Sequence, residues 1–324
     1  MSYQIVTVEK FKKIFPLVLM SFHLKARAAS VQTADSSQEQ SVVVGVIDTG
    51  VDIDHRLLKD NIWTNAGETG VDQYGHRKES NGLDDDGNGY IDDVHGWNFV
   101  ENNNQVVDDV GHGTHVAGII HQQFNKFKVA RNNQLKIMPL RFYSSKLSVE
   151  KIISNGVKAI EYAIKMKASI LNYSGGGVSP DLEESKAILK AQAADIILVA
   201  AAGNNHQNSD IDKFYPAGYG YSNIIRVASI DSDANLSRFS NFGVKTVDIA
   251  APGNRILSAA PKNTMEYLSG TSQSTAYVTG RLAAAQLTCA SCSLEMRKNL
   301  LFLSAKKINQ LKGFIKTQLA LVDE

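Results

Sequence analysis

The sequence predicts an α/β fold in which a mostly parallel central sheet is covered by helices on both faces. Short, continuously apolar runs recur along the chain, as is typical of strands that are buried on both sides. These runs occupy residues 42–47, 135–140, 169–173, 196–201, 224–228 and 247–250. Apolar residues also recur at a helical period between 150 and 166. Strands that alternate with helices form parallel β-α-β units, so the sheet is expected to lie between two helix layers.

The first 40 residues differ in composition from the rest. Lysines precede a short apolar run at 14–22, and residues 26–28 read Ala-Arg-Ala, an order typical of a secretory signal peptide. The run is too short to span a bilayer and Pro16 interrupts it, so no stable membrane anchor is expected. We interpret 1–28 as a signal peptide of a secreted or periplasmic protein and 29–40 as a short flexible segment. A disordered N-terminal extension is the alternative.

Residues 41–324 show no internal repeat and no linker, so one domain is expected there. A chain of 324 residues can bury a large core without a disulfide framework. Its 43% hydrophobic and 21% charged residues are usual for a globular protein. The net charge is +1 and no block of Lys and Arg occurs, which argues against partners such as nucleic acid or an anionic membrane.

The two cysteines, Cys289 and Cys292, stand in a C-x-x-C spacing. One such pair is too few for a tetrahedral zinc site unless His or carboxylate ligands join it. A local disulfide is the first interpretation and a pair of free thiols the second. A redox role is disfavoured because the surrounding sequence reads as the end of a helix.

Polar and glycine residues follow three of the predicted strands. Asp48 comes directly after the first run, Ser-Gly-Gly at 174–176 after the third, and Gly203-Asn204 after the fourth. Functional residues of open parallel sheets gather beyond the carboxyl ends of the strands. A convergent site is therefore expected at this edge of the sheet.

The chain contains candidates for each part of a serine nucleophile site. Acyl transfer by a serine needs a base, a carboxylate that orients the base, and donors for the developing oxyanion. Asp48 is an acid at a strand end, His112 precedes a helix-like stretch, and Ser272 precedes another. A serine at a helix start directs its own N–H and the positive end of the helix dipole toward a developing negative charge. Asn204 is the candidate for the second donor.

Four segments together resemble a known family. Val-Ile-Asp-Thr-Gly (46–50), Gly-His-Gly-Thr-His-Val-Ala-Gly (111–118), Ala-Ala-Gly-Asn (201–204) and Gly-Thr-Ser (270–272) are similar to the signature motifs of the subtilisin-like serine proteases, or subtilases. They occur in the order Asp, His, Ser, which is the subtilisin order. The resemblance extends over roughly residues 42–290. It implies a three-layer subtilisin-like fold and a serine endopeptidase that acts on protein or peptide substrates.

The resemblance also implies a role for each candidate residue. Asp48 would orient His112, His112 would be the general base and acid, and Ser272 would be the nucleophile. Asn204 would complete the oxyanion hole. His115, next to the reactive histidine, is expected to be a packed helix residue.

Four further residues are implied to bind the substrate. The segment of Ser174, Gly175 and Gly176 would pair with the substrate backbone as an added strand, and its glycines would leave room for side chains. Gly203 would also contact the substrate. No cofactor is required for this chemistry.

An acidic segment lies between the Asp and His motifs. Residues 83–93 combine clustered carboxylates with two glycines, and His95 stands where an EF-hand loop would have its bidentate Glu. We interpret the segment as a structural Ca²⁺ site, with a solvated acidic turn as the alternative. With residues 96–99 it resembles an insertion seen in bacterial members of the family. The candidate ligands, at positions 1, 3, 5 and 9 of an EF-hand-like loop, are Asp84, Asp86, Asn88 and Asp92.

The chain departs from the family pattern in two ways. Gln273 and Ala276 stand where Met and Pro are usual, but neither change touches the hydroxyl or the oxyanion donors. About a dozen residues separate 28 from 41, too few for a folded propeptide. A monomer that folds unaided or with a separate folding partner or inhibitor is expected. The rival hypotheses are a non-catalytic subtilase scaffold and a calcium-dependent surface module.

Overall fold

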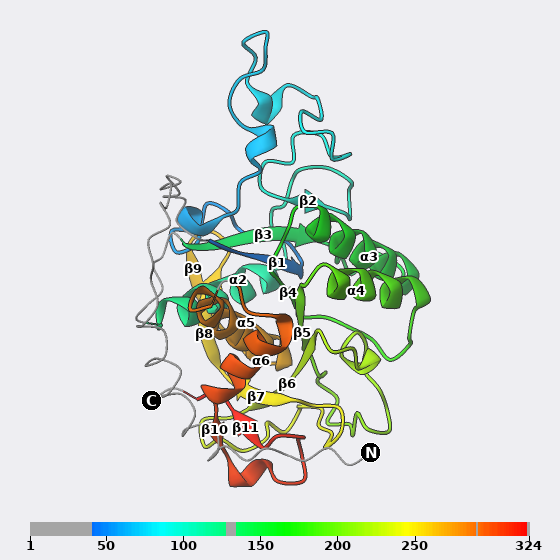
Figure 1. Cartoon of the computed structure of the whole chain (residues 1–324), viewed down its shortest axis with the longest axis vertical. Coiled ribbons are helices and arrows are strands. Elements are labelled where there is room, and N and C mark those ends of the chain that lie inside the picture. Colours follow the sequence, from blue (N-terminus) through cyan, green and yellow to red (C-terminus); the bar gives the residue numbers. More distant parts are fainter. Residues whose placement is uncertain (1–40, 128–133, 290, 323–324) are drawn as a thin grey trace, which may run out of the picture. The chain divides into compact units, whose positions relative to one another are not determined.

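A nine-stranded sheet lies at the centre of the computed structural model, which describes residues 41–127, 134–289 and 291–322 (Figure 1). Its strand order is β10-β11-β7-β6-β5-β4-β1-β3-β2. Neighbouring strands are parallel, except that β10 and β11 pair antiparallel. The bounds are Val42–Asp48 (β1), Trp97–Asn98 (β2), Leu135–Arg141 (β3), Ile170–Tyr173 (β4), Ile197–Ala201 (β5), Ile224–Ile230 (β6), Ile249–Pro252 (β7), Lys306–Lys307 (β10) and Leu319–Ala320 (β11).

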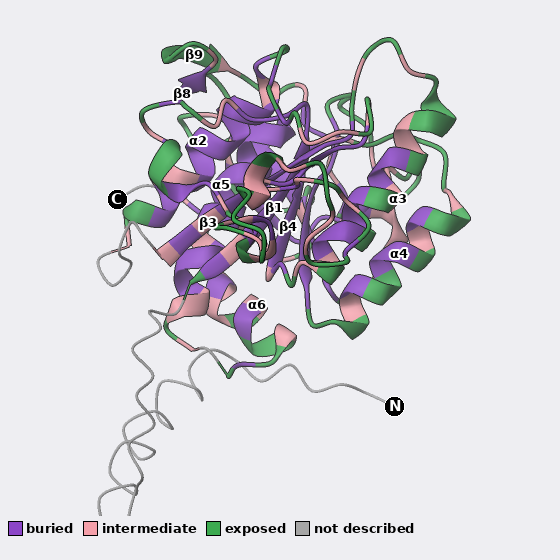
Figure 2. Cartoon of the chain, turned by 90° about the horizontal axis from the view of Figure 1, so that it is seen from above, coloured by how far each residue is buried: buried purple, intermediate pink, exposed green. Residues whose placement is uncertain are grey.

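Helices cover both faces of the sheet (Figure 2). On one face lie α2 (His112–Asn125) and α5 (Thr271–Leu287), with α6 (Leu294–Leu303) against α5. On the other face lie α3 (Val149–Lys165) and α4 (Leu182–Ala193). The predicted three-layer α/β architecture is confirmed. All six predicted strands are present, although β7 begins at Ile249 and not at 247.

Strand β1 shows why the buried strands read as continuous apolar runs. Val44 and Val46 pack in the core cluster formed with α2 and α5, whereas Ile47 packs in the cluster formed with α3 and α4. Gly45 also faces the second layer, because a Cβ there would lie 2.7 Å from the Leu171 side chain. Successive residues of a strand point to opposite faces, so a doubly covered strand needs apolar or small residues at every position.

The sequence patterns do not predict the antiparallel hairpin of β8 (Ile256–Ala260) and β9 (Thr264–Leu268). Residues of β9 are mostly exposed, so this strand lacks the apolar run that marks the others. His115 of α2 is fully buried beneath the hairpin, and its Nε2 lies 3.0 Å from the Ile256 carbonyl oxygen and 3.1 Å from that of Glu266. His115 therefore has the packed environment expected of it.

Several expectations concern the ends of the chain. The signal peptide at 1–28 and the flexible segment at 29–40 lie outside the described residues. A disulfide joins Cys289 and Cys292 just after α5, in agreement with the first interpretation of this pair. Among the helices of the described ranges, none is both long and apolar enough to cross a bilayer.

Candidate active site

The end of β1 and the start of α2 bring Asp48 and His112 together. His112 Nδ1 lies 2.7 Å from Asp48 Oδ1, and the Thr49 backbone N–H donates to the same carboxylate oxygen over 2.8 Å. Asp48 is only 3% exposed. Its carboxylate therefore favours the tautomer with a proton on Nδ1, which leaves Nε2 of His112 free to accept a proton.

Glycine is required where α2 begins against β1. A Cβ at Gly113 would lie 2.1 Å from the Gly50 carbonyl oxygen and 3.1 Å from the Asp48 Cβ. Any larger residue would therefore push the helix start away from the strand end. The Gly-His-Gly motif thus sets the distance between the His112 imidazole and the Asp48 carboxylate.

Asp108 is a buried residue of this region that the sequence interpretation missed. Its Oδ1 accepts from the Thr49 hydroxyl (2.9 Å) and the Gly111 N–H (2.8 Å). Its Oδ2 accepts from the N–H (2.8 Å) and hydroxyl (2.6 Å) of Thr114. A carboxylate that binds the first N–H groups of a helix stabilises that helix end. The sequence signal that could have identified Asp108 is its place a few residues before the predicted helix start at His112.

Two opposing effects act on the pKa of His112. Burial lowers it, but the charge of Asp48, the hydrogen bond to Asp48 and the charge of Asp108 together raise the pKa above the ordinary 6.5. The imidazolium is therefore more stable here than in water. This favours a histidine that takes up a proton during a reaction.

Ser272 is the second residue of α5, where backbone N–H groups are not used within the helix. Its hydroxyl donates to the Ser174 carbonyl oxygen over 2.9 Å, and the Ser174 hydroxyl donates to the Ser272 carbonyl oxygen over 3.2 Å. The hydroxyl proton is thus directed at Ser174 and not at His112. That proton has to leave the Ser174 carbonyl before His112 can accept it.

Asn204 and the start of α5 border one small space. The Asn204 Oδ1 accepts from the N–H (2.8 Å) and hydroxyl (2.9 Å) of Thr271, which fixes the orientation of the amide. Gly270 has no side chain, and a Cβ placed on it would lie 3.5 Å from Asn204 Nδ2 and 3.7 Å from the Ser272 nitrogen. Two N–H donors therefore converge beside a glycine, as an oxyanion site requires.

A cleft of about 750 Å³ runs from Asp48 and His112 along the loop after β4, and neither Ser272 nor Asn204 is among its lining residues. Among the predicted substrate residues, Ser174, Gly175 and Gly176 line the cleft. In the described structure no hydrogen bond engages the backbone of Gly175 or Gly176. The remaining lining residues are Asp48, Thr49, Val110, His112, Phe142, Tyr143, Val149, Ile152, Ile153, Tyr173, Gly177, Val178, Ser179, Glu184 and Tyr215.

Gly203, the other predicted substrate residue, is buried next to Asn204. Its φ is +105°, and a Cβ would lie 2.4 Å from Asn241 Nδ2. The Asn241 amide in turn donates to the Ala202 carbonyl oxygen over 2.9 Å. Gly203 therefore gives the turn that presents Asn204 and does not line the cleft.

Comparison with known proteins agrees with this geometry. The sequence profile of the subtilase family matches residues 39–316. The chain belongs to the subtilase family. Subtilases are serine endopeptidases that act on peptides or proteins, and their catalysis generally needs no cofactor.

Individual relatives of this subtilase cover it to different extents. Subtilisin DY of Bacillus licheniformis is 30% identical over 263 residues, which is 77% of this chain and 80% of that protein. Subtilisin-like protease 2 of Plasmodium falciparum is 32% identical over 257 residues, 77% of this chain but only 17% of that protein. The crystal structure of a cold adapted subtilisin-like serine proteinase has a TM-score of 0.64 and 25% identity, and covers 93% of this chain and 97% of that one.

The carboxylates of Asp84 and Asp92 in the acidic segment of the subtilase accept hydrogen bonds from backbone N–H groups. The Asp84 carboxylate accepts from the N–H groups of Asn88 (2.9 Å) and Gly89 (2.7 Å). The Asp92 carboxylate accepts from the Gly82 N–H at 3.2 Å. Asp84 therefore stabilises a turn, and Asp92 joins two parts of the segment that are ten residues apart.

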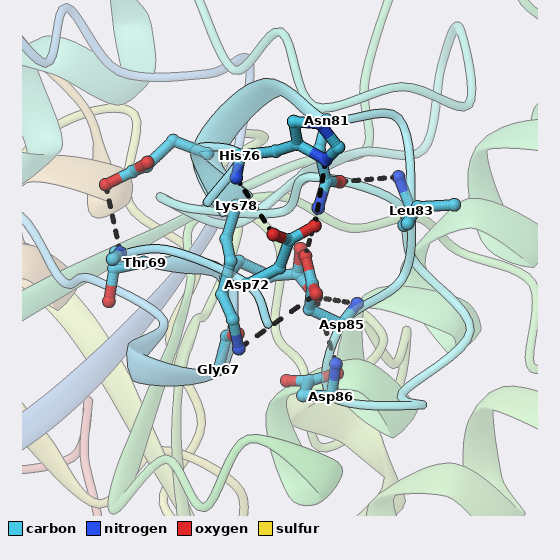
Figure 3. A network of polar contacts seen from close by, with 12 residues as sticks. Gly67, Thr69, Asp72, His76, Lys78, Asn81, Leu83, Asp85 and Asp86 are labelled. Atoms are coloured by element: carbon cyan, nitrogen blue, oxygen red, sulfur yellow. Dashed lines mark hydrogen bonds and ion pairs between the residues drawn. The ribbon is translucent and has the colours of Figure 1, made fainter. Parts of the chain in front are cut away.

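Neighbouring groups in the acidic segment are held in the same way. The Asn81 amide donates to the Asp85 carboxylate over 2.8 Å, and Lys78 approaches the other oxygen of that carboxylate at 4.0 Å (Figure 3). Local side-chain contacts of this kind, and not strands or long helices, give the segment its shape.

Three carboxylates do converge, but only Asp86 belongs to the predicted set. Oxygen atoms of Glu68, Asp86 and Asp93 all lie within 4.8 Å of one another. The amides of Asn65 and Asn88 each donate to both Asp86 and Asp93. Burial raises the pKa of Asp93 despite these amide hydrogen bonds, and it raises the pKa of Glu68 despite hydrogen bonds from backbone N–H groups. The sequence interpretation missed Glu68 because it precedes the acidic run by many residues.

Glu68 also has an unused ligand atom. The residue is 0% exposed, and its Oε1 accepts from the N–H groups of Asp85 (2.8 Å) and Asp86 (3.2 Å). Its Oε2 is buried and has no hydrogen-bond partner in the described structure. A buried carboxylate oxygen without a donor is costly unless a cation binds it.

Proposed function

We propose that this chain is a serine endopeptidase that hydrolyses peptide bonds through an acyl-enzyme on Ser272. The observation that carries the proposal is the 2.7 Å contact between His112 Nδ1 and the buried Asp48 carboxylate. An imidazole oriented in this way by a buried carboxylate is what acyl transfer by a serine requires of its base. The Ser272 hydroxyl binds the carbonyl of Ser174, which lines the same cleft as His112. Family membership supports the same reaction class.

The mechanism assigns one step to each group. Once it has left the Ser174 carbonyl, the Ser272 hydroxyl gives its proton to His112 Nε2, and its oxygen attacks the substrate carbonyl carbon. Asp48 stabilises the resulting imidazolium, while Asn204 Nδ2 and the Ser272 N–H bind the oxyanion. The C–N bond then breaks as His112 returns the proton to the leaving amine. Water, activated by the same imidazole, hydrolyses the ester and frees Ser272.

Substrate binding is proposed along the loop after β4. The free backbone groups of Gly175 and Gly176 are available to pair with an extended peptide, which would lie as an added strand at the edge of the loop. The Ser174 carbonyl, now the acceptor for the Ser272 hydroxyl, lies at the junction of this strand and the reaction centre. Gly203 would act through the turn that holds Asn204.

Cleavage of an internally quenched peptide library tests the proposed reaction. The wild-type chain is expected to cleave peptides, and Ser272→Ala is expected to lose this activity while keeping its thermal unfolding midpoint. Ser269→Ala, which removes an exposed hydroxyl three residues earlier, is the matched control and is expected to stay active. Equal cleavage by the wild type and Ser272→Ala would reject the assignment of the nucleophile.

A structural cation is proposed for the acidic segment. Glu68, Asp86 and Asp93 offer the hard oxygen ligands that Ca²⁺ prefers, and the unpartnered Oε2 of Glu68 lies among them. The ion would hold the segment between β1 and β2 and would take no part in the chemistry. Of the ligands expected from the loop spacing, Asp86 is retained; Asp84, Asn88 and Asp92 would shape the turns around it.

Export and domain organisation remain proposals as well. We infer a signal peptide at 1–28, a flexible segment at 29–40 and a peptidase domain at 41–324, with release outside the cytoplasm. The disulfide between Cys289 and Cys292 supports an oxidising compartment. N-terminal sequencing of protein recovered from culture medium, with a first residue near 29, would support this scheme; recovery from the cytoplasm with residue 1 intact would contradict it.

A further inference from the structure

Glu184 is a buried carboxylate in the wall of the cleft that the proposed mechanism does not use. It lies in the first turn of α4 and is only 4% exposed. The other charged or titratable side chains of the cleft wall include Asp48 and His112, and no Lys or Arg lines the cleft within the described residues. Around this cleft, negative charge is therefore not balanced by a basic side chain.

The side-chain groups that hydrogen-bond to the Glu184 carboxylate in the described structure are tyrosine hydroxyls, and neither carries a positive charge. Its Oε1 accepts from the Tyr173 hydroxyl over 3.2 Å, and its Oε2 lies 2.9 Å from the Tyr219 hydroxyl oxygen. The Tyr219 hydroxyl also lies 2.8 Å from the Asp181 carbonyl oxygen. A phenol has one proton, so it cannot donate to Glu184 and Asp181 at once. A carboxylate accepts about four hydrogen bonds, so Glu184 keeps unused capacity.

Basic residues near Glu184 are already paired with other carboxylates. Lys186 binds the exposed Glu183 over 2.7 Å, and Lys190 binds Glu161 over 2.5 Å. In the described part of the chain, Glu184 makes no ion pair. Burial is the main cause that raises its pKa, against the hydrogen bonds from the tyrosines. A buried acid without a cation is destabilising, unless a ligand supplies the cation.

The glycines of the cleft keep a path to this carboxylate open. A Cβ at Gly175 would lie 3.3 Å from the Phe142 ring and 3.7 Å from the Tyr173 ring, so a larger residue would stand over both. Without one, the apolar faces of these rings border the space that leads toward Glu184. An aliphatic stem packs well on such faces while its charged end reaches a carboxylate.

We propose that Glu184 is a specificity-determining residue that binds the cationic end of a Lys or Arg side chain of the substrate. The stem of that side chain packs along the cleft wall against the cleft-facing edges of Phe142 and Tyr173, whose rings are in contact with each other (centroids 5.3 Å apart), and its N–H groups bind Glu184. This inference rests on the proposed peptidase function, because it assigns a preference to the same cleft.

Peptide binding to the inactive Ser272→Ala chain tests the inference without relying on turnover. Peptides that carry Lys, in turn, at each position are compared by calorimetry with peptides that carry acetyl-lysine there, which keeps the four-carbon stem of Lys but has no charge. At one position Lys is expected to bind about 10- to 100-fold more tightly. Glu184→Gln is expected to remove this ratio, and the matched control Glu183→Gln to leave it unchanged.

The possible outcomes distinguish a failure of the specificity inference from a failure of the proposed peptidase function. Equal binding of Lys and acetyl-lysine peptides at every position, or failure of all peptides to bind, would overturn the inference even if Glu184→Gln did not fold. A Lys preference that Glu184→Gln leaves intact would also overturn it. Cleavage by the wild type without a basic preference would reject only the inference. A Lys preference in binding without any cleavage would reject the proposed function and support the role of Glu184.

Discussion

Buried carboxylates occur in both the catalytic cleft and the acidic segment, and their partners differ. In the cleft, Asp108 receives hydrogen bonds from backbone N–H groups and hydroxyls at the start of α2, and Asp48 faces the His112 imidazole. In the acidic segment, Glu68 and Asp93 face another carboxylate. Asp93 accepts from the Asn65 and Asn88 amides, and Glu68 Oε1 accepts from two backbone N–H groups. One oxygen of Asp48 and one of Glu68 lack a hydrogen-bond partner in the described structure, but only Asp48 has an imidazole opposite it. The acidic segment, in which three carboxylates face one another, is therefore the region expected to need a cation. This difference between the two regions can be tested.

The largest effect is expected from removal of the base in the cleft. His112→Ala is expected to lower kcat/KM by a factor on the order of 10⁵–10⁶, because the proton acceptor is lost, while the fold is unchanged. His76→Ala, in the exposed part of the acidic segment, is the matched control and is expected to keep full activity. Similar losses for both variants, measured with one peptide substrate, would contradict the division between the two regions.

A smaller but still large effect is expected for Asp108→Ala. It leaves several buried donors at the start of α2 without an acceptor, so the free energy of unfolding should fall by about 3 kcal/mol. The variant should also lose activity, because the helix start positions His112. The neighbouring Asp109, exposed and paired with Arg141, is the control: Asp109→Ala should cost at most about 1 kcal/mol. Chemical denaturation measures the free energy of unfolding of both variants. Equal losses for Asp108→Ala and Asp109→Ala would show that Asp108 does not organise the start of α2.

Calcium is expected to stabilise the acidic segment. Calcium at about 100 times its dissociation constant should stabilise the wild type by about 2.7 kcal/mol, and a chelator should remove this gain. Glu68→Gln should lose most of the calcium effect, whereas Glu79→Gln, on the exposed side of the segment, should keep it. Thermal unfolding with and without the ion measures this. A calcium effect that Glu68→Gln leaves intact would reject the proposed ligand set.

The smallest expected effect is a shift in the pH profile. His112 must be neutral to accept a proton, and its pKa is raised above 6.5. Activity should therefore be low below that pKa and should rise to a plateau as the pH passes it. Asp108→Asn removes one of the charges that raise the pKa, so the rise should move to lower pH. Activity that persists unchanged down to about pH 4 would contradict the role of His112.

The two regions also differ in how well the sequence predicts them. Apolar runs and small residues predict the strand that leads to Asp48 and the two helices that begin near His112 and Ser272. A sheet that is covered on both faces imposes those patterns on the sequence. Gly203 and Asn204 were predicted as neighbours, but only the structure shows that Gly203 is buried behind the turn. Local sequence patterns do not report such packing.

The proposed cation site shows the limit of spacing arguments. Asp84 and Asp92 fit an EF-hand-like spacing, but their oxygens are not in the cluster of converging carboxylates and accept from backbone N–H groups. Glu68 lies outside the acidic run and reaches it through the tertiary fold. The same holds for Glu184, whose place in the cleft depends on the packing of α4 against β4 and is not marked by any motif.

Labelling with a fluorophosphonate probe, followed by peptide mapping, tests the central claim most directly. The probe reacts only with a serine that an imidazole activates next to oxyanion donors, so it reports on Asp48, His112, Asn204 and Ser272 together. The expected result is a single adduct on the peptide that contains Ser272, which His112→Ala prevents. Folded protein that stays unlabelled, or that is labelled at another serine, would contradict the proposed catalytic site.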